Sequence, residues 1–312
     1  MIFTHTSVMP QEIRDYLDLK PGNTCVDCTL GGSGHALTSL KAVLPGGRLI
    51  GTDQDRDAVE NAHRVFEAHA ENVHIFHDNF SKVPRILESL GIDGVDGILL
   101  DLGLSLHQLR QGKRGFSFKG DEPLDMRMDL RSDRTAADIV NQLDERELID
   151  IFFKYGEERM SRKIARAIVK ARTVSPITRN RELSEIVRAA IPAKIVHQQK
   201  IHPATRVFQA LRIVVNRELE RLERFMAAVP DLLNPGGRIC VISFHSLEDR
   251  IVKQQFRAFE QGCTCPRDFP RCVCGFTPRL KSVSRKAIFP TKEETEANPM
   301  ARSARLRVAE KV

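Results

Sequence analysis

The order of strand-like and helix-like segments in the first hundred residues limits the fold more than any other feature of this sequence. Short apolar, β-favouring runs alternate with segments whose apolar residues recur at three- and four-residue spacing. The runs predicted as strands are 24–30, 48–53, 73–80 and 95–102, and those predicted as helices are 35–44, 55–66 and 83–90. This alternation predicts a parallel, doubly wound α/β sheet.

The alternation stops after Gly103, and the next convincing strand is "GRICVISF" at 237–244, preceded by a predicted turn at 234–237. A compact domain does not leave so long an interval as loop. Segments within it such as "ERMSRKIARAIVKART" have helical spacing, and none alternates like a strand. We therefore predict a helical domain inserted into the α/β core, with a long segment, 204–229, returning the chain to the sheet. The predicted parts are 1–111 and 204–312 for the core and 112–203 for the insertion.

Composition excludes several classes of protein. A chain of 312 residues with 41% hydrophobic residues can bury a full core. No apolar run approaches the roughly 18 residues that a membrane helix needs, and the N-terminal sequence lacks the residue order of a signal peptide. We expect a cytoplasmic protein with no membrane partner. The sequence does not indicate an oligomeric state.

Positive charge is concentrated in one part of the chain. The whole sequence has a net charge of +7, whereas residues 159–217 contain fourteen Lys or Arg and two acidic residues, a net charge of +12. A run of charge is often only a solvated helix face. The near absence of acidic residues favours a nucleic acid partner, because solubility alone favours surfaces of mixed sign.

The stretch "DCTLGGSGH" at 27–35 joins the first predicted strand to the first predicted helix. A glycine turn there places backbone N–H groups and a helix N-terminus at the ligand-binding edge of the sheet. Asp53 ends the second predicted strand, and its carboxylate suits the hydroxyl groups of a ribose. A turn that only packs the helix close to the strand explains the glycines, but it does not explain the glycines together with Asp53.

The cofactor inferred from this turn is S-adenosylmethionine. The glycines do not follow the G-x-G-x-x-G pattern of a dinucleotide site. Asp27 suits the amino group of a methionine moiety or an organised loop around it. Phe80, after the third strand, offers an aromatic wall for adenine; the residue by itself is better explained by a core position, and its place at the end of a strand favours the cofactor role. Asp101 ends the fourth strand and is the candidate catalytic residue, because methylation of an exocyclic amine is helped by a hydrogen-bond acceptor near the N–H. A carboxylate that only fixes a loop or the cofactor amine is the alternative.

Eight motifs distributed over nearly the whole chain resemble the bacterial RsmH (MraW) family. They are "HTSVMPQE" (5–12), "DCTLGGSGH" (27–35), "GILLDLGLS" (97–105), "RGFSF" (114–118), "PLDMRMD" (123–129), "HPATRVFQALRIVVNRELE" (202–220), "ISFHSLEDRIVK" (242–253) and "NPMARSARLRVAE" (298–310). The resemblance implies an S-adenosylmethionine-dependent N4-methyltransferase that acts on one cytidine of small-subunit ribosomal RNA, in the decoding region near the P site. It also implies a Rossmann-like class I methyltransferase core with an inserted all-helical domain.

The resemblance also implies a set of cofactor contacts. Carried over by position, they are Ser33, Gly34, His35, Asp53, Phe80, Asp101 and Gln108. The family often has a second glycine where Ser33 stands, so a small side chain must fit beside the cofactor there, and the contact could be through the backbone only. The substrate is 16S ribosomal RNA, either naked or in the assembled 30S subunit.

Substrate-side residues are predicted from three motifs. Phe116 and Phe118 could stack on a cytosine extruded from the RNA, with Arg114 and Arg127 on the flanking phosphates. For the two phenylalanines, packing beneath a loop is the alternative. Beyond "ISF", His245 and Ser246 are candidates at the ligand edge of the sheet, although Ser246 followed by two acidic residues also has the pattern of a helix cap.

Four of the seven cysteines cluster near residue 270. Cys263, Cys265, Cys272 and Cys274 form two C-x-C pairs, which could hold a structural zinc ion in a cytoplasmic protein. C-x-x-C is the commoner zinc spacing, and a cysteine-rich loop without metal is the alternative.

Two other classes of function compete with a methyltransferase. A dehydrogenase has the same type of sheet, but the missing G-x-G-x-x-G pattern argues against it. A non-catalytic RNA-binding factor is supported by the basic segment alone.

Overall fold

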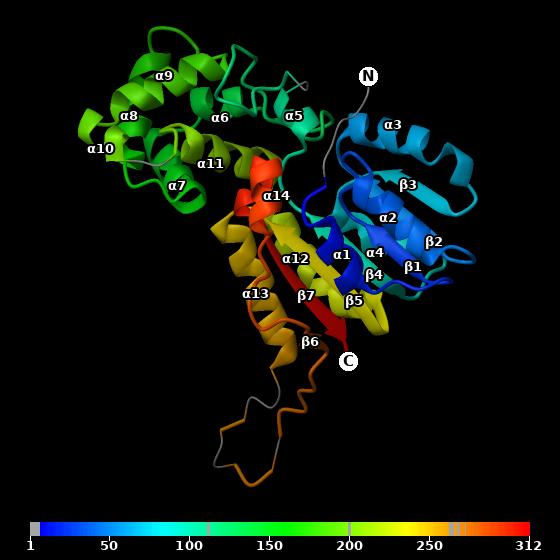
Figure 1. Ribbon diagram of the computed structural model, residues 1–312. Helices are drawn as coiled ribbons and strands as arrows, with labels where there is room; N and C mark the ends of the chain where they lie inside the picture. The colour runs from blue at the N-terminus through cyan, green and yellow to red at the C-terminus, as the bar shows by residue number, and fades with distance from the viewer. Residues whose placement is uncertain (1–6, 111–112, 199–200, 262–264, 267–268, 272) are drawn as a thin grey trace. The chain divides into compact units, whose positions relative to one another are not determined.

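The structure is a computed structural model that describes residues 7–110, 113–198, 201–261, 265–266, 269–271 and 273–312. The chain divides into two compact units (Figure 1): a core unit of residues 1–103 and 219–312, and an inserted unit of residues 104–218. The sequence placed these boundaries at 111/112 and 203/204. They differ because α5 (Leu106–Arg110) and α11 (Thr205–Asn216) also lie in the inserted unit.

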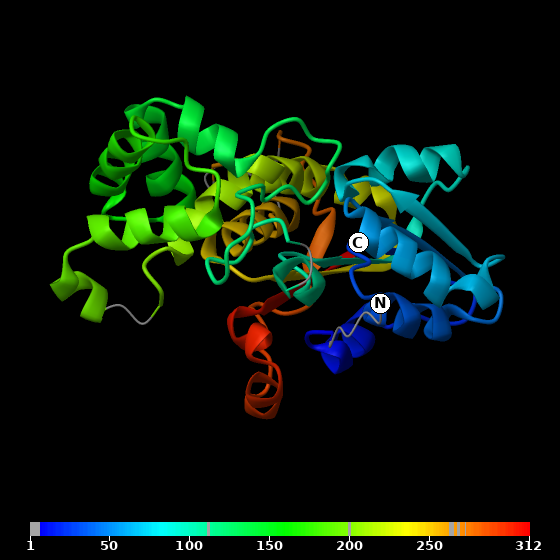
Figure 2. The ribbon, with the colours of Figure 1, turned by 90° about the horizontal axis from the view of Figure 1, so that it is seen from above.

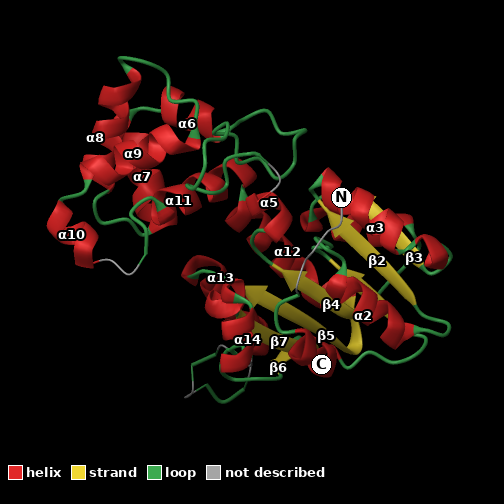
Figure 3. Ribbon diagram, turned by 45° about the horizontal axis from the view of Figure 1, so that its top comes forward, coloured by secondary structure: helices red, strands yellow, loops and turns green. Residues whose placement is uncertain are grey.

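The core unit is built on a seven-stranded sheet of order β3-β2-β1-β4-β5-β7-β6 (Figure 3). The first five strands in this order are parallel, and β7 is antiparallel to both of its neighbours. The bounds are β1 Thr24–Asp27, β2 Arg48–Asp53, β3 Val73–His77, β4 Val95–Asp101, β5 Leu233–Ser243, β6 Leu280–Ser282 and β7 Arg305–Lys311. The predicted doubly wound α/β core is therefore confirmed.

Helices cover both faces of this sheet. Ile98 and Leu100 of β4 belong to an apolar cluster with α4, α12 and α13, whereas Leu99 belongs to a second cluster with α1. Consecutive buried residues in one strand are typical of a parallel sheet covered on both faces. The core helices are α1 Pro10–Leu17, α2 Gly34–Val43, α3 Arg56–Val65, α4 Val83–Ser89, α12 Glu218–Leu232, α13 Ser246–Glu260 and α14 Lys292–Ala297, with short 3-10 turns at Glu67–His69, Phe80–Lys82 and Pro299–Ser303.

Several predicted elements differ from the structure. β1 and β3 end three residues early, because the chain leaves the sheet there to form the loops of the ligand edge. The predicted turn at 234–237 lies within β5, where the pairing with β4 jumps from Val95↔Leu233 to Gly97↔Arg238. The long segment 204–229, which was predicted to return the chain to the sheet, forms two helices, because Arg217 has a φ of 51° and ends α11. The short strand β6 was not predicted.

The inserted unit has its own helical core (Figure 2). Its helices pack around buried side chains such as Phe152, Ile164 and Leu211. Capping boxes at Thr135 and Asp144 satisfy the first N–H groups of α6 and α7. Besides α5 and α11, its helices are α6 Ala136–Gln142, α7 Glu145–Gly156, α8 Ser161–Arg172, α9 Asn180–Ala190 and α10 Ala193–Gln198. No described helix of either unit has the length and apolar character needed to cross a membrane.

Asn216 links α11 to the loop before α6, and its replacement by leucine should destabilise the inserted unit. Its amide donates to the carbonyl of Met126 (2.8 Å) and accepts from the N–H of Met128 (2.7 Å), both buried. Leucine leaves both backbone groups unsatisfied, at about 1–3 kcal/mol each. We expect Asn216→Leu to lower the free energy of unfolding by about 3 kcal/mol in urea titrations.

The matched control is Gln209→Leu on the same helix, where one half-buried amide donates to the carbonyl of Tyr155 (3.2 Å). We expect a loss of about 1 kcal/mol or less there. Equal losses at the two positions would show that the Asn216 bonds do not stabilise this unit.

Candidate cofactor site

Three aspartates lie at the same edge of the core sheet because each ends a parallel strand. Asp27 is the last residue of β1, Asp53 of β2 and Asp101 of β4, and β1 lies between β2 and β4. In register, Asp27 is paired with Gly51 and Leu99, each two residues before the aspartate of its own strand. This is the carboxyl edge, where ligands bind in open α/β sheets.

The turn from β1 into α2 has a backbone that suits glycine. Gly31 has a φ of 44° and Ser33 a φ of 66°, both in the left-handed region. The Ser33 N–H donates to the carbonyl of Leu30 (2.6 Å), and the Gly31 N–H donates to Oδ2 of Asp53 (2.9 Å). This conformation explains why glycine is favoured where Ser33 stands. The Ser33 hydroxyl is buried, and its Oγ has no hydrogen-bond partner among the described residues.

Residues 7–9 lie directly over the start of α2. A Cβ added to Gly34 would overlap Oγ of Ser7, so a larger residue there would require the Ser7 hydroxyl to move. The N–H of Met9 donates to Oε1 of Glu294 in α14 (2.6 Å), which fixes the segment from the other end of the chain. This cover could not be predicted from the sequence, because it depends on a contact between residues 285 positions apart.

Asp27 is fully buried at this edge, and Asp53 and Asp101 are half-buried. Oδ1 of Asp27 accepts from the N–H of Thr29 (3.0 Å), whereas Oδ2 has no partner in the described part of the chain. Burial raises the pKa of Asp27 to about 7, and the Asp53 carboxylate adds to this rise. Burial also raises the pKa of Asp53 to about 6, against the effect of the Gly31 and Asp55 N–H groups that donate to it.

The carboxyl group of Asp101 also has a raised pKa. Burial, and then the nearby Asp27 and Glu248, raise the pKa of its carboxyl well above the usual range. Its Oδ1 is buried with no partner among the residues described, and its Oδ2 lies 3.8 Å from Nε2 of the buried His35. No described Lys or Arg forms an ion pair with any of the three aspartates. A cluster of carboxyls with raised pKa values favours the binding of a positively charged ligand.

Residues that follow β3 form another part of this edge of the sheet. Phe80 is buried in the core cluster and contacts Phe225 edge-to-face at 5.5 Å. The structure thus gives Phe80 a packing role, and its contact with a cofactor stays a prediction.

Gln54 was not predicted as a site residue. Its Oε1 accepts from the side chains of Asn79 (3.0 Å) and Arg221 (2.7 Å). A lone glutamine after a strand gave no signal for this bridge.

His245 and Ser246 lie where β5 meets α13, and the predicted helix cap was wrong by one residue. The N-cap is His245, whose Nδ1 accepts from the N–H of Glu248 (3.4 Å), and Ser246 is the first helical residue. Oε2 of Glu248 accepts in return from the N–H groups of Phe244 and His245. Imidazole can serve as the capping acceptor, which a sequence rule based on Ser, Thr, Asp and Asn overlooks.

The predicted substrate residues of the inserted unit have partners within that unit. Arg114 is buried and donates to the carbonyls of Arg127 (3.2 Å) and Met128 (3.0 Å). Arg127 forms a two-point ion pair with Asp125, at 2.8 Å for both contacts. These contacts order the loop before α6, and phosphate binding by either arginine stays a prediction.

The two phenylalanines and Gln108 are also placed within the inserted unit. Phe116 is buried in the apolar core, whereas Phe118 stacks on the imidazole of His202 with 4.3 Å between ring centroids. Gln108 in α5 is buried, and its Oε1 accepts from the N–H of Ser105 (3.0 Å). Packing therefore accounts for Phe116, while Phe118 shows that an aromatic ring can stack at this position. The ligand contacts predicted for all three stay predictions.

The cysteine cluster is only partly described. Cys265 is half-buried and Cys274 is exposed in the core unit. Cys263 and Cys272 lie outside the described residues. The structural zinc ion stays a prediction.

The fold and this edge together define a class of protein. A Rossmann-like sheet with an antiparallel β7 beside β5, a glycine turn after β1 and an acidic residue at the end of β2 is a class I S-adenosylmethionine-dependent methyltransferase core. The buried, unpartnered polar atoms of Asp27, Ser33 and Asp101 fit a ligand that carries both an ammonium and a carboxylate group.

Sequence comparison gives the family. The MraW methylase family matches residues 2–312, and the chain belongs to this family. Proteins named ribosomal RNA small subunit methyltransferase H are 78% identical in Desulforapulum autotrophicum, 53% in Geobacter sulfurreducens and 50% in Clostridium botulinum. Each comparison extends over 312 residues and covers 100% of both chains.

Solved structures were also compared. An S-adenosylmethionine-dependent O-methyltransferase from Thermotoga maritima has a TM-score of 0.42 and 12% identity, covering 99% of this chain and 67% of the other. Fibrillarin from Aeropyrum pernix, solved with bound S-adenosylmethionine, has a TM-score of 0.37 and 11% identity, covering 93% and 67%.

Proposed function

We propose that this protein transfers a methyl group from S-adenosylmethionine to the exocyclic N4 of one cytidine in the decoding (P-site) region of bacterial 16S ribosomal RNA. The observation that carries the proposal is the group of three carboxyls, one buried and two half-buried, at the ends of β1, β2 and β4, beside a glycine turn and a helix N-terminus. Membership of the MraW methylase family and the names of the relatives support it. The substrate, as naked RNA or as the 30S subunit, places the reaction in the cytoplasm.

Residues of the core unit would hold the cofactor, which supplies an electrophilic methyl group on a positively charged sulfur. Asp53 accepts from the N–H groups of Gly31 and Asp55, and because each carboxylate oxygen has two lone pairs, the group can also accept from ribose hydroxyls. Oδ2 of Asp27 suits an ammonium group. Oγ of Ser33 and the first N–H groups of α2 suit a carboxylate.

Asp101 is proposed to act on the base. The N4 amine of cytosine is a weak nucleophile because its lone pair is conjugated with the ring, and a carboxylate that accepts its N–H localises that lone pair. Asp101 must be ionised to do so. A bound cation favours the ionised form, so the carboxyl group becomes a better acceptor when the site is filled.

The raised pKa values of Asp27 and Asp53 predict that S-adenosylmethionine binds more tightly as the pH rises from about 5 to about 7. In the empty site the carboxyls hold protons that a cationic ligand must displace, so affinity should rise by up to about tenfold per pH unit for each proton released. Calorimetric titrations at pH 6 in buffers of different ionisation enthalpy would measure the protons released. Asp27→Asn should flatten the profile, and an affinity independent of pH in the wild-type protein would contradict the assignment.

The same pKa shifts have a defined effect on the ligand-free protein. Folded Asp27 and Asp53 bind protons more tightly than they do in the unfolded chain, whose aspartates titrate near pH 4. The stability that these groups contribute is therefore present below about pH 4 and is lost as the pH rises toward about 7.

The basic face of α8 is proposed as an RNA contact. Arg162, Lys163, Arg166 and Lys170 line a surface groove of about 470 Å³ in the inserted unit. Within the part of the chain that the structure describes, only Arg166 has an ion-pair partner in this set, Glu145 at 3.6 Å. Exposed cations that lack acidic partners are available to phosphates.

Reversal of three of these charges tests this surface. The triple variant Arg162→Glu, Lys163→Glu and Arg166→Glu should weaken RNA binding by at least about tenfold and reduce the slope of log K against log salt. Fluorescence anisotropy with a decoding-region RNA measures both quantities. Arg146→Glu, on the neighbouring α7, should have little effect. An unchanged slope in the triple variant would exclude this face from the RNA contact.

Equilibrium binding tests the cofactor part of the proposal directly. S-adenosylmethionine should bind to the wild-type protein with one-to-one stoichiometry, whereas NADH should not bind. Binding of NADH in place of S-adenosylmethionine would support the dehydrogenase alternative and overturn the proposal.

A further inference from the structure

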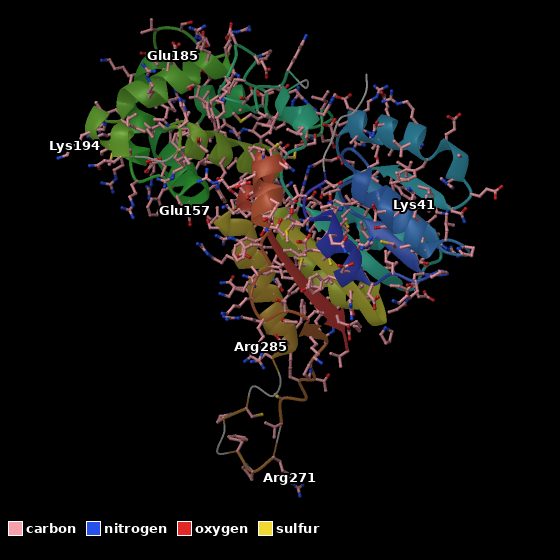
Figure 4. The ribbon with its side chains drawn as sticks, viewed as in Figure 1. Lys41, Glu157, Glu185, Lys194, Arg271 and Arg285 are labelled. Atoms are coloured by element: carbon pink, nitrogen blue, oxygen red, sulfur yellow. The ribbon has the colours of Figure 1, made fainter. Side chains whose placement is uncertain are left out.

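The core unit has a concave surface between α13 and the segment that follows β6, in addition to the groove of the inserted unit described above. This concave surface has a volume of about 290 Å³, and its basic side chains are Lys253, Arg257, Arg285 and Arg307. We call this surface the basic groove. Arg285 reaches it from the segment after β6 (Figure 4), whereas Lys253 and Arg257 belong to α13.

The charges of the basic groove are not balanced within the described structure. Arg307 is neutralised by Asp249, with contacts of 2.6 and 3.3 Å. Glu260, the acidic residue in the lining, accepts from the N–H (3.2 Å) and the hydroxyl (2.8 Å) of Ser282. Lys253, Arg257 and Arg285 are exposed and form no ion pair with any described residue. Three cations without partners therefore share one concavity.

The spacing of these cations suits a linear series of negatively charged groups, such as phosphates. Lys253 and Arg257 are four residues apart on α13, so their side chains are neighbours on one face of the helix. Lys253 lies eight residues after His245, about 12 Å along the helix axis, so the groove is separate from the cofactor edge. The aromatic residue in the lining, Phe256, is buried, which leaves the exposed surface polar. A protein partner would need an apolar anchor here, whereas phosphates need only cations and hydroxyls.

We propose that the basic groove binds phosphate groups of a single strand of the ribosomal RNA, as a contact separate from the cofactor site. This inference rests on the proposed function, which makes ribosomal RNA the substrate. Phosphate contacts of this kind fix the position of the RNA without reading its sequence. The groove therefore contributes to affinity and placement, and the methyl transfer step takes place elsewhere.

The test compares two double variants that remove the same charge. Lys253→Gln with Arg257→Gln removes two of the three unpaired charges of the groove, and Lys41→Gln with Arg85→Gln removes two exposed cations from α2 and α4 of the same unit (Lys41 in Figure 4). Binding of a labelled single-stranded decoding-region RNA is measured between 50 and 300 mM KCl. Loss of two phosphate contacts should reduce the salt slope by about 1.4 and weaken binding several-fold, with the control unchanged.

Three results bear on the proposal. An equal slope in the groove variant and the wild-type protein would overturn it. Inorganic tripolyphosphate serves as a second probe. If the groove variant loses binding of tripolyphosphate but keeps the wild-type binding of RNA, the groove is a site for small anions and the proposal fails. If the slope falls as expected while the wild-type protein transfers no methyl group to any RNA, the groove stands and the proposed reaction fails.

Discussion

Replacement of Asp53 by alanine is expected to weaken the binding of S-adenosylmethionine by about 100-fold and to abolish methyl transfer at ordinary cofactor concentrations. The carboxylate has a structural function and a proposed binding function. It accepts from the N–H groups of Gly31 (2.9 Å) and Asp55 (2.8 Å), which holds the glycine turn against β2. In the proposed site it also accepts from the ribose hydroxyls of the cofactor. Loss of two hydrogen bonds between a carboxylate and ribose hydroxyls costs about 3 kcal/mol, which is about 100-fold in affinity.

The control for Asp53→Ala is Asp93→Ala, an exposed aspartate before β4. Calorimetric titration should give the wild-type affinity for the control, and RNA binding should be retained by both variants. Asp53→Asn should have an intermediate effect, because the amide keeps one acceptor oxygen. A dissociation constant within threefold of wild type in Asp53→Ala would remove the end of β2 from the cofactor site.

Asp101→Asn is expected to lower the rate constant for methyl transfer by about 10² to 10⁴-fold while the dissociation constant of S-adenosylmethionine changes by no more than a few fold. Asparagine preserves the size of the side chain but cannot accept a proton. Single-turnover kinetics with saturating cofactor would separate this effect from binding.

The same variant decides between the two roles open to Asp101. If the carboxylate holds the cofactor amine instead of the base, the loss will appear in the dissociation constant and the rate at saturation will be nearly normal. That result would contradict the catalytic assignment. Asp101→Glu provides a further check, because a carboxylate restored at a shifted position should recover part of the rate.

Most of the core fold could be predicted because its signals are local. Strands such as β4 contain short apolar runs, here Ile98 to Leu100, and the helices between the strands have regular apolar spacing, so the alternation of the two patterns predicts the sheet. Asp27, Asp53 and Asp101 could be found for the same reason: each follows such a run, and parallel strands place their carboxyl ends at one edge. The short strand β6 carried no such signal, because three residues are too few to show a period.

Residues whose roles depend on distant contacts could not be predicted. The cover of residues 7–9 over Gly34 depends on Glu294, and the bridge at Gln54 depends on Arg221. Arg114 and Arg127 illustrate a different problem, because their local sequence did carry a signal but did not reveal their partners. Basic residues in a glycine-containing loop suggest phosphate contacts, whereas in the structure both donate to groups of their own loop. A sequence gives the charge of a side chain but not the partner that its fold supplies.

The most direct test of the proposed function is transfer of a labelled methyl group from S-adenosylmethionine to small ribosomal subunits, and to naked 16S RNA, from cells that lack this activity. The RNA is digested and its nucleosides are separated. We predict label in N4-methylcytidine at one position of the decoding region, with none when Asp53→Ala replaces the wild-type protein. Label in another nucleoside, or no transfer to either substrate by a protein that binds S-adenosylmethionine, would contradict the proposal.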